Sequence, residues 1–167
     1  MNIKMLVMDV DGTLTDGKIN ICVNGELFKS FDIKDGYGIS NILPKNGITP
    51  VVITGRESKI LSIRMKELGV KEVYQNVSDK LPVIKKICKK YKISLDEVAF
   101  IGDDCNDLES MLAVGIAFAP RDCAKCVRVD TVHILEKNGG CGAVRECIEY
   151  LVEYNGNQNE SSCVSSS

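Results

Sequence analysis

The acidic residues of this chain include two short motifs whose spacing could support chemistry. The first is Asp9-Val10-Asp11-Gly12-Thr13, and the second is Gly102-Asp103-Asp104-Cys105-Asn106-Asp107. Carboxylates brought together repel each other strongly unless a cation lies between them, and an all-oxygen set of ligands suits Mg²⁺. If the two motifs meet in the fold, we expect a magnesium site. Taken singly, each motif is also compatible with a turn or a helix cap.

Two further segments carry polar groups that could work beside these acids. Thr54-Gly55-Arg56 follows an apolar run, and Lys80 stands near the start of an expected helix. Thr54 alone could be a helix N-cap, and Lys80 alone could be an ordinary surface lysine. Each of the four pieces, however, follows a predicted strand or begins a predicted helix. This order along the chain favours one shared site with a hydroxyl, an ammonium group and several carboxylates.

The elements that must position these residues alternate between strand-like and helix-like segments. This alternation predicts a parallel sheet covered by helices on both faces. Ligands bind beyond the carboxyl ends of the strands in such sheets, where the acids of this chain lie. The predicted strands are Ile3–Met8, Ile48–Ile53, Glu72–Gln75, Val98–Ile101, Gly115–Phe118 and Thr131–Ile134. The predicted helices include Tyr37–Asn46, Asp79–Tyr91 and Gly142–Tyr154.

We expect a single domain over residues 1–154, interrupted by a β-hairpin at about residues 18–31. The pair Asn24-Gly25 between alternating runs is a strong hairpin signal. The hairpin could be a surface decoration, an oligomer contact or the rim of the site. Residues 155–167 are polar and of low complexity, so we expect a disordered tail.

Bulk composition excludes several classes of protein. The 167 residues carry 21 basic and 23 acidic side chains, a net charge of -2, which gives no support for a nucleic-acid or membrane surface. The first apolar run is too short for a secretory signal or a membrane span, so we expect a cytoplasmic protein.

The eight cysteines are scattered through apolar runs and do not indicate a disulfide scaffold. We expect Cys22, Cys88 and Cys147 to be small core residues. The pair Cys123 and Cys126 lacks the partners of a zinc site, and we interpret it, like the lone His133, as structural.

The four pieces together resemble the motifs of the haloacid dehalogenase superfamily, over nearly the whole chain to Tyr154. The resemblance implies an α/β, Rossmann-like doubly wound parallel sheet and phosphoryl transfer through an aspartyl-phosphate. It implies Asp9 as nucleophile, Asp11 as general acid and base, and Thr54 and Lys80 as ligands of the phosphoryl group. The implied Mg²⁺ ligands are Asp9, the Asp11 backbone carbonyl and Asp103, with Asp104 and Asp107 orienting them. The segments between motifs leave no room for a cap domain.

Further segments are similar to a capless subgroup, the 3-deoxy-D-manno-octulosonate 8-phosphate phosphatases. They are Asp16-Gly17, Asp35-Gly36-Tyr37-Gly38-Ile39, Ser78-Asp79-Lys80 and Asn138-Gly139-Gly140-Cys141-Gly142. This similarity implies a homotetramer and a small sugar-acid phosphate as substrate. It also suggests that Gly55, Arg56 and Arg64 contact the substrate, with Arg64 acting within the subunit or across an interface.

Three alternatives stay open at the level of sequence. The substrate could be a nonulosonate 9-phosphate, although an Arg at position 56 favours the octulosonate. The chain could be a non-catalytic oligomerisation or regulatory domain related to acylneuraminate cytidylyltransferases. It could also be a phospho-receiver domain, although receivers place their phosphorylated Asp after the third strand, where this chain has Gln75-Asn76.

Overall fold

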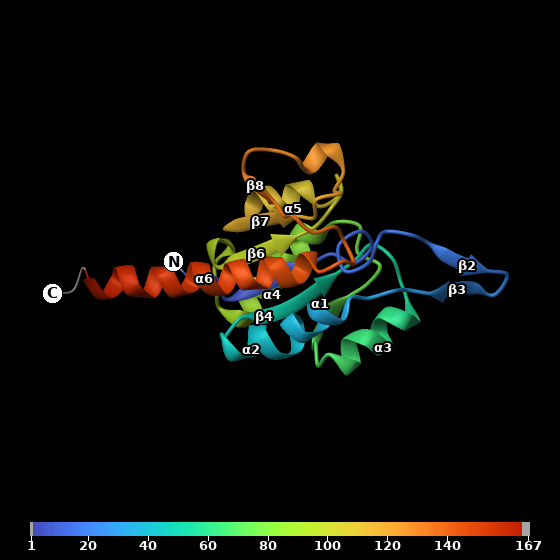
Figure 1. Cartoon of the computed structure of the whole chain (residues 1–167), viewed down its shortest axis with the longest axis horizontal. Coiled ribbons are helices and arrows are strands. Elements are labelled where there is room, and N and C mark those ends of the chain that lie inside the picture. The colour runs from blue at the N-terminus through green and yellow to red at the C-terminus, as the bar shows by residue number, and fades with distance from the viewer. Residues whose placement is uncertain (1, 165–167) are drawn as a thin grey trace.

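The central element is a six-stranded sheet with the order β5-β4-β1-β6-β7-β8, in which every pairing is parallel (Figure 1). The computed structural model describes residues 2–164. The strands are β1 (Met5–Met8), β4 (Thr49–Ile53), β5 (Glu72–Tyr74), β6 (Val98–Ile101), β7 (Ile116–Ala119) and β8 (Val132–Ile134). Numbered among themselves, they have the order 3-2-1-4-5-6 of the doubly wound dinucleotide-binding type. The predicted fold class is therefore confirmed.

The strands are apolar on both faces, because each face is covered by helices. In β1, Leu6 and Met8 pack into one core cluster, whereas Met5 and Val7 pack into the other. The first cluster is closed by α3 (Lys59–Glu67), α6 (Ala143–Val164) and the helical segment of residues 33–45. The second is closed by α4 (Lys80–Tyr91), α5 (Leu108–Ala113) and the 3₁₀ turn Lys125–Val127.

The helical segment expected at Tyr37–Asn46 begins four residues earlier and is not uniform. It consists of α1 (Ile33–Tyr37), a π-helical turn (Gly38–Ile42) and α2 (Leu43–Lys45). Asp32 caps its start, and the Asp32 side chain accepts hydrogen bonds from the backbone N–H groups of Lys34 and Asp35. The sequence-based boundary missed this cap. Pro44, which lacks a backbone N–H, stands at the beginning of α2, directly after the π-helical turn.

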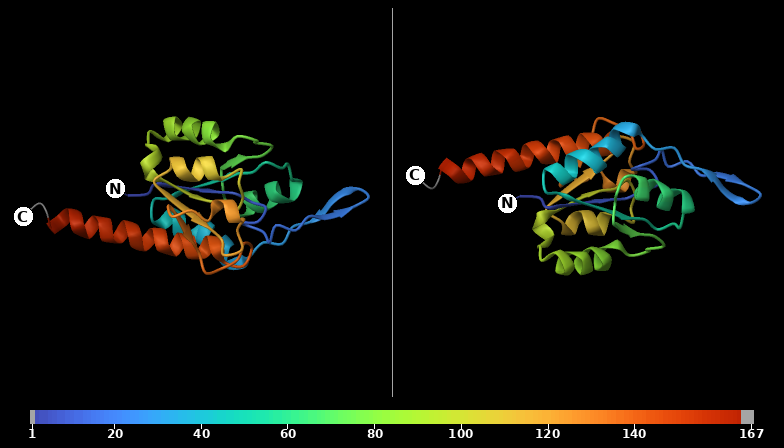
Figure 2. Two further views of the ribbon diagram at one scale, coloured as in Figure 1. Left: turned by 90° about the horizontal axis from the view of Figure 1, so that it is seen from above. Right: turned by 90° about the horizontal axis from the view of Figure 1, so that it is seen from below.

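A two-stranded hairpin, β2 (Asn20–Cys22) and β3 (Gly25–Phe28), projects from the body of the molecule (Figures 1 and 2). The predicted hairpin is confirmed with shorter strands, and its turn lies at Val23 and Asn24. Gly25 follows the turn with a φ of 110°, a conformation that favours glycine. No cap domain accompanies this hairpin among residues 2–164.

Helix α6 is longer than expected and extends away from the sheet on the side opposite the hairpin (Figure 2). We expected helix only to Tyr154 and disorder beyond, but the helix continues to Val164. Asn155 anchors this stretch, since its side chain exchanges two hydrogen bonds of 2.8 Å with the backbone of Ile3. Residues 165–167 of the expected tail lie outside the described part.

Two of the three cysteines expected in the core, Cys88 and Cys147, are buried, but Cys22 is exposed on the hairpin. The expectation for Cys22 was wrong because the two-stranded hairpin has no layer packed over it. The ring of His133 packs against those of Phe118 and Tyr150, with centroid distances of 5.4 Å and 5.3 Å, and the latter two rings lie 5.2 Å apart. Within residues 2–164, no helix combines the length and the apolar character that crossing a membrane requires.

Candidate active site

The carboxyl ends of β1, β4 and β6 enclose a crevice of about 170 Å³. Strands β1 and β6 are neighbours whose following helical layers lie on opposite faces, which is where doubly wound sheets bind their ligands. The crevice is lined by Asp9, Asp11, Thr54, Gly55, Arg56, Asp103, Asp104 and Asn106. The structure thus brings together seven of the residues singled out in the sequence. Asn106 was missed, although it lies within the second acidic motif.

Lys80 and Asp107 lie beneath this crevice and are almost completely buried. The Lys80 ammonium contacts Asp9 and, at 2.5 Å, Asp107. Burial works against the charge of Lys80, but the charges of Asp9 and Asp107 outweigh it and raise its pKa. Lys80 is the first residue of α4, so the helix start delivers its ammonium directly to the end of β1. It is not the surface lysine that its position alone would suggest.

Asp107 organises the loop that follows β6. Its Oδ2 accepts hydrogen bonds from the backbone N–H groups of Asp103 (3.0 Å) and Asp104 (3.3 Å), while Oδ1 accepts from Lys80. Although Asp107 precedes α5, its side chain caps none of the helix N–H groups. The second acidic motif is therefore a preorganised loop and not a simple helix cap.

The carboxylates of Asp9, Asp103 and Asp107 can approach one another within 4.8 Å. Burial raises the pKa of Asp9 to about 6. Burial, followed by the charges of Asp9 and Asp107, raises the pKa of Asp103 to about 7. A divalent cation would remove this repulsion, and hard oxygen donors fit Mg²⁺. Because both Asp107 oxygens already accept hydrogen bonds, Asp9 and Asp103 are the side chains best placed to hold the ion.

Gly12 allows the two acidic motifs to approach each other. Its φ of 98° lies in the left-handed region, and a Cβ at this position would lie 2.0 Å from Oδ2 of Asp103. The Thr13 hydroxyl then donates a hydrogen bond of 3.2 Å to Oδ1 of Asp103. Any larger residue at position 12 would push Asp103 out of its place.

Thr54 is buried at the end of β4, and its backbone is fixed by hydrogen bonds with Tyr74 and Val77. It does not cap α3, because Ser58 performs that function through a 3.1 Å bond from the N–H of Leu61. Gly55 and Arg56 are exposed at the rim of the crevice. The Thr54 hydroxyl is therefore available to the crevice, with Arg56 beside its mouth.

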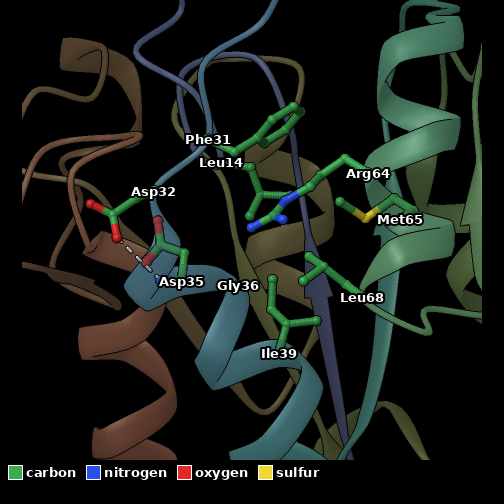
Figure 3. A pocket seen from close by; sticks show the side chains of 9 residues that line it. All are labelled: Leu14, Phe31, Asp32, Asp35, Gly36, Ile39, Arg64, Met65 and Leu68. Carbon is green, nitrogen blue, oxygen red and sulfur yellow. Dashed lines mark hydrogen bonds between the residues drawn. The ribbon is translucent and has the colours of Figure 1, made fainter.

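Arg64 is the one predicted site residue that the structure does not bring to the crevice. Its side chain lies in a separate recess among Leu14, Phe31, Asp35, Gly36, Ile39, Met65 and Leu68 (Figure 3). The guanidinium forms a 2.9 Å ion pair with Glu67 and faces the ring of Phe31. Gly36 makes this position possible, since a Cβ there would lie 2.3 Å from Nη2 of Arg64. Helix spacing alone could not reveal this recess.

Two residues of the hairpin reach the site and were missed by sequence reasoning. The Lys29 ammonium contacts the Asp11 carboxylate and lies 3.2 Å from Glu26. Glu26 in turn accepts a hydrogen bond from the hydroxyl of Ser58. The charged pair Glu26 and Lys29, spaced three residues apart at the end of the hairpin, was the available signal. It was overlooked because hairpin residues are usually surface residues.

Cys126 forms a disulfide with Cys105, and not with its sequence neighbour Cys123. Cys105 lies inside the second acidic motif, so the bridge ties this loop to the 3₁₀ turn of residues 125–127. Asp104, Cys105 and Cys126 also form a group that could surround a metal ion. Sulfur atoms joined in a disulfide are not thiolates, however, so this group does not compete with the carboxylate site for Mg²⁺.

Comparisons with known proteins agree with this geometry. Residues 53–148 match the family model of haloacid dehalogenase-like hydrolases. The 3-deoxy-D-manno-octulosonate 8-phosphate phosphatase KdsC of Salmonella typhi is 38% identical over 159 residues, which cover 95% of this chain and 84% of that protein. The corresponding KdsC of Haemophilus influenzae is 36% identical over 155 residues, covering 93% and 86%.

Solved structures show the same similarity. The Moraxella catarrhalis phosphatase of that name, in complex with magnesium, phosphate and KDO, superposes with a TM-score of 0.88 at 36% identity, covering 97% of this chain and 92% of that one. The cobalt-bound phosphatase YrbI of Haemophilus influenzae gives a TM-score of 0.87 at 38% identity, covering 93% and 90%.

Proposed function

The chain belongs to the haloacid dehalogenase-like hydrolases, and on that premise we propose that it hydrolyses 3-deoxy-D-manno-octulosonate 8-phosphate, with Mg²⁺ as its cofactor. The products are the free sugar acid and inorganic phosphate. The observation that carries this proposal is the buried Asp9 at the end of β1, contacted by Lys80 and facing Asp103 across the crevice. Relatives that are named for this reaction align with most of the chain.

The reaction begins with attack of an Asp9 oxygen on phosphorus. A carboxylate needs no separate base for this step. As the bond from phosphorus to the sugar oxygen breaks, the Asp11 carboxylic acid gives its proton to that oxygen. In the second half, the Asp11 carboxylate takes a proton from the water that attacks the phosphoryl group on Asp9. Asp9 and Asp11 thus return to their starting forms.

The remaining crevice residues hold the transferred group. The Thr54 hydroxyl donates a hydrogen bond to a phosphoryl oxygen, and Lys80 stabilises negative charge close to Asp9.

The cation is held by Asp9, Asp103 and the Asp11 backbone carbonyl. Asp107 fixes the loop after β6, and Asp104 lies at the edge of that loop. Bound Mg²⁺ supplies positive charge that shields the nucleophile from the negative phosphate. Arg56, with Gly55 beside it, takes the carboxylate end of the substrate.

The alternatives differ in how well the structure supports them. The receiver reading is not supported, because receivers of the CheY type use the strand order 2-1-3-4-5. A non-catalytic domain has no need for a complete set of buried, mutually contacting charges such as Lys80 with Asp9 and Asp107. A nonulosonate 9-phosphate stays the second candidate substrate, and Arg56 favours the octulosonate over it.

A turnover assay with both substrates tests the proposal. The purified chain should release phosphate repeatedly from the octulosonate 8-phosphate when Mg²⁺ is present, and chelation should stop the release. Nonulosonate 9-phosphates should have a kcat/KM at least about tenfold lower, the cost of roughly 1.4 kcal/mol of mismatched binding. A higher kcat/KM for a 9-phosphate would assign the second substrate. No release of phosphate from either substrate would leave only the hypothesis of a non-catalytic domain.

We further propose that the chain acts as a cytoplasmic homotetramer in which the hairpins associate. Support comes from the apolar side chains that the projecting hairpin exposes, namely Ile19, Ile21, Val23, Leu27 and Phe28. Light scattering should give the mass of four chains, and Val23→Ser with Leu27→Ser should lower it. A monomer in the unaltered chain would contradict the proposal.

A further inference from the structure

Lys29 is a buried cation that no motif accounts for. It follows β3 directly, and only 3% of its side chain is exposed, compared with 79% for Lys18 at the other side of the hairpin. Its ammonium contacts Asp11 and lies 3.2 Å from Glu26. Burying a lysine is unfavourable unless its charge is paired, so these two acidic side chains keep it in place.

Glu26, the second partner of Lys29, is hydrogen-bonded to the body of the protein. Glu26 accepts a hydrogen bond from the Ser58 hydroxyl, and Ser58 itself caps α3. Burial opposes the ionisation of Glu26, but the hydrogen bonds from Ser58 and Lys29 outweigh it and lower the pKa of Glu26. The Lys29 ammonium is thus paired with the ionised Glu26 on one side and contacts Asp11 on the other.

The two aspartates of the first motif therefore each contact a lysine of their own. Lys80 contacts Asp9, and Lys29 contacts Asp11. Because the implied metal contact of Asp11 uses its backbone carbonyl, its side chain is left for proton transfer. A carboxyl that must meet the leaving oxygen gains most from a fixed orientation.

We propose that Lys29 is a positioning residue that holds the Asp11 side chain at the point where it exchanges a proton with the substrate. The inference rests on the proposed function. The Asp11 proton passes to the departing oxygen, the resulting carboxylate pairs with the Lys29 ammonium, and water then returns a proton to Asp11. Lys29 keeps its own three protons throughout.

The leaving group distinguishes this role from a merely structural one. A sugar alkoxide is a poor leaving group and needs the proton of Asp11, whereas p-nitrophenolate departs as an anion. General acid catalysis contributes roughly 100- to 10,000-fold where it is needed. We therefore expect Lys29→Met to lower kcat for the sugar-acid phosphate by about 100-fold, on the same principle, and to leave that for p-nitrophenyl phosphate nearly unchanged.

The matched control is Lys18→Met, which removes the same charge from the exposed side of the same hairpin and should change neither rate. The loss of kcat in Asp11→Asn gives the full contribution of general acid catalysis. Adding Lys29→Met to Asp11→Asn should cost little more, because residues that act as a unit are not additive. Lys29→Arg, which restores the cation, should recover part of the rate.

Equal losses on both esters, or full additivity with Asp11→Asn, would overturn the role of Lys29 while leaving the proposed function intact. If the unaltered chain hydrolyses neither ester, both ideas fail together. A crystal structure of the Lys29→Met variant provides a readout independent of turnover. It should show the Asp11 side chain displaced from the crevice, and an unmoved Asp11 side chain would contradict the inference even if the variant is slow.

Discussion

Asp9 is buried among charged side chains of both signs. Its carboxylate has a cation on one side, Lys80, and two further carboxylates, Asp103 and Asp107, within reach. At such distances an effective dielectric constant of about 20 gives interactions of about 4 kcal/mol per pair. The arrangement carries more negative than positive charge, so it is completed by a divalent cation. At the scale of the residue, this unpaired charge is the main reason to expect Mg²⁺.

Arg56 gives a prediction at the same scale. Arg56→Ala should raise KM for the sugar-acid phosphate about 10- to 100-fold, because a hydrogen bond to a charged group contributes about 1.5–3 kcal/mol. The KM for p-nitrophenyl phosphate, which has no carboxylate, serves as the internal control in steady-state kinetics. An equal rise for both esters would remove Arg56 from recognition of the sugar acid.

The site residues were predictable to different degrees. Asp9, Asp103 and Lys80 could be placed because strand ends and a helix start are visible in sequence patterns. The position of Arg64 could not, because it depends on the space above Gly36. Lys29 could not either, since its burial depends on its contacts with Asp11 and Glu26 where the hairpin joins the body of the molecule. Tertiary packing, and not local propensity, decided both cases.

At the scale of elements, the loop after β6 combines the acidic motif with a disulfide. Reduction of Cys105–Cys126 should lower the free energy of unfolding by about 3 kcal/mol, given a separation of 21 residues in sequence. Denaturant unfolding with and without a reductant measures this difference. Cys126→Ser should show no response to the reductant, and Cys22→Ser, at an exposed free cysteine, should respond like the unaltered chain. A response that persists in Cys126→Ser would contradict the assignment.

The contact between α1 and α6 should make stability depend on pH. Asp35 is buried, with Oδ1 accepting a 2.7 Å hydrogen bond from the N–H of Arg145 and Oδ2 without a partner. Burial raises the pKa of Asp35 from 3.8 to about 6. Its stabilising contribution is therefore complete below pH 3.8 and is lost as the pH rises through about 6.

An Asp35→Asn variant removes this titration. The free energy of unfolding, measured from pH 3.5 to 7.5, should fall less steeply with rising pH in the variant than in the unaltered chain, with a difference of about 3 kcal/mol at most. Glu153→Gln, at an exposed acid of α6, does not remove the buried group and should keep the original slope. Parallel curves for Asp35→Asn and the unaltered chain would contradict this explanation.

At the scale of the whole molecule, the strand order places chain segments far apart in sequence around one crevice. The parallel sheet and its flanking helices could be predicted because β1, β4 and β6 are short apolar runs separated by helical periodicity. The length of α6 could not be predicted from its polar composition. Asn155 ties this helix to Ile3, which lies 152 residues away in sequence. Such distant contacts leave no local pattern.

The proposed reaction depends on the transfer of a phosphoryl group to Asp9. The most direct test mixes the chain with Mg²⁺ and 3-deoxy-D-manno-octulosonate 8-phosphate, quenches during turnover, and reduces any acyl phosphate with borohydride before mass spectrometry of the peptides. We predict reduction of the Asp9 side chain only, with no signal in the absence of Mg²⁺. The Asp9→Asn variant should stay folded, show no signal and lose at least about 1,000-fold in phosphate release. Reduction at another aspartate, or continued turnover by Asp9→Asn, would contradict the role of Asp9 as nucleophile.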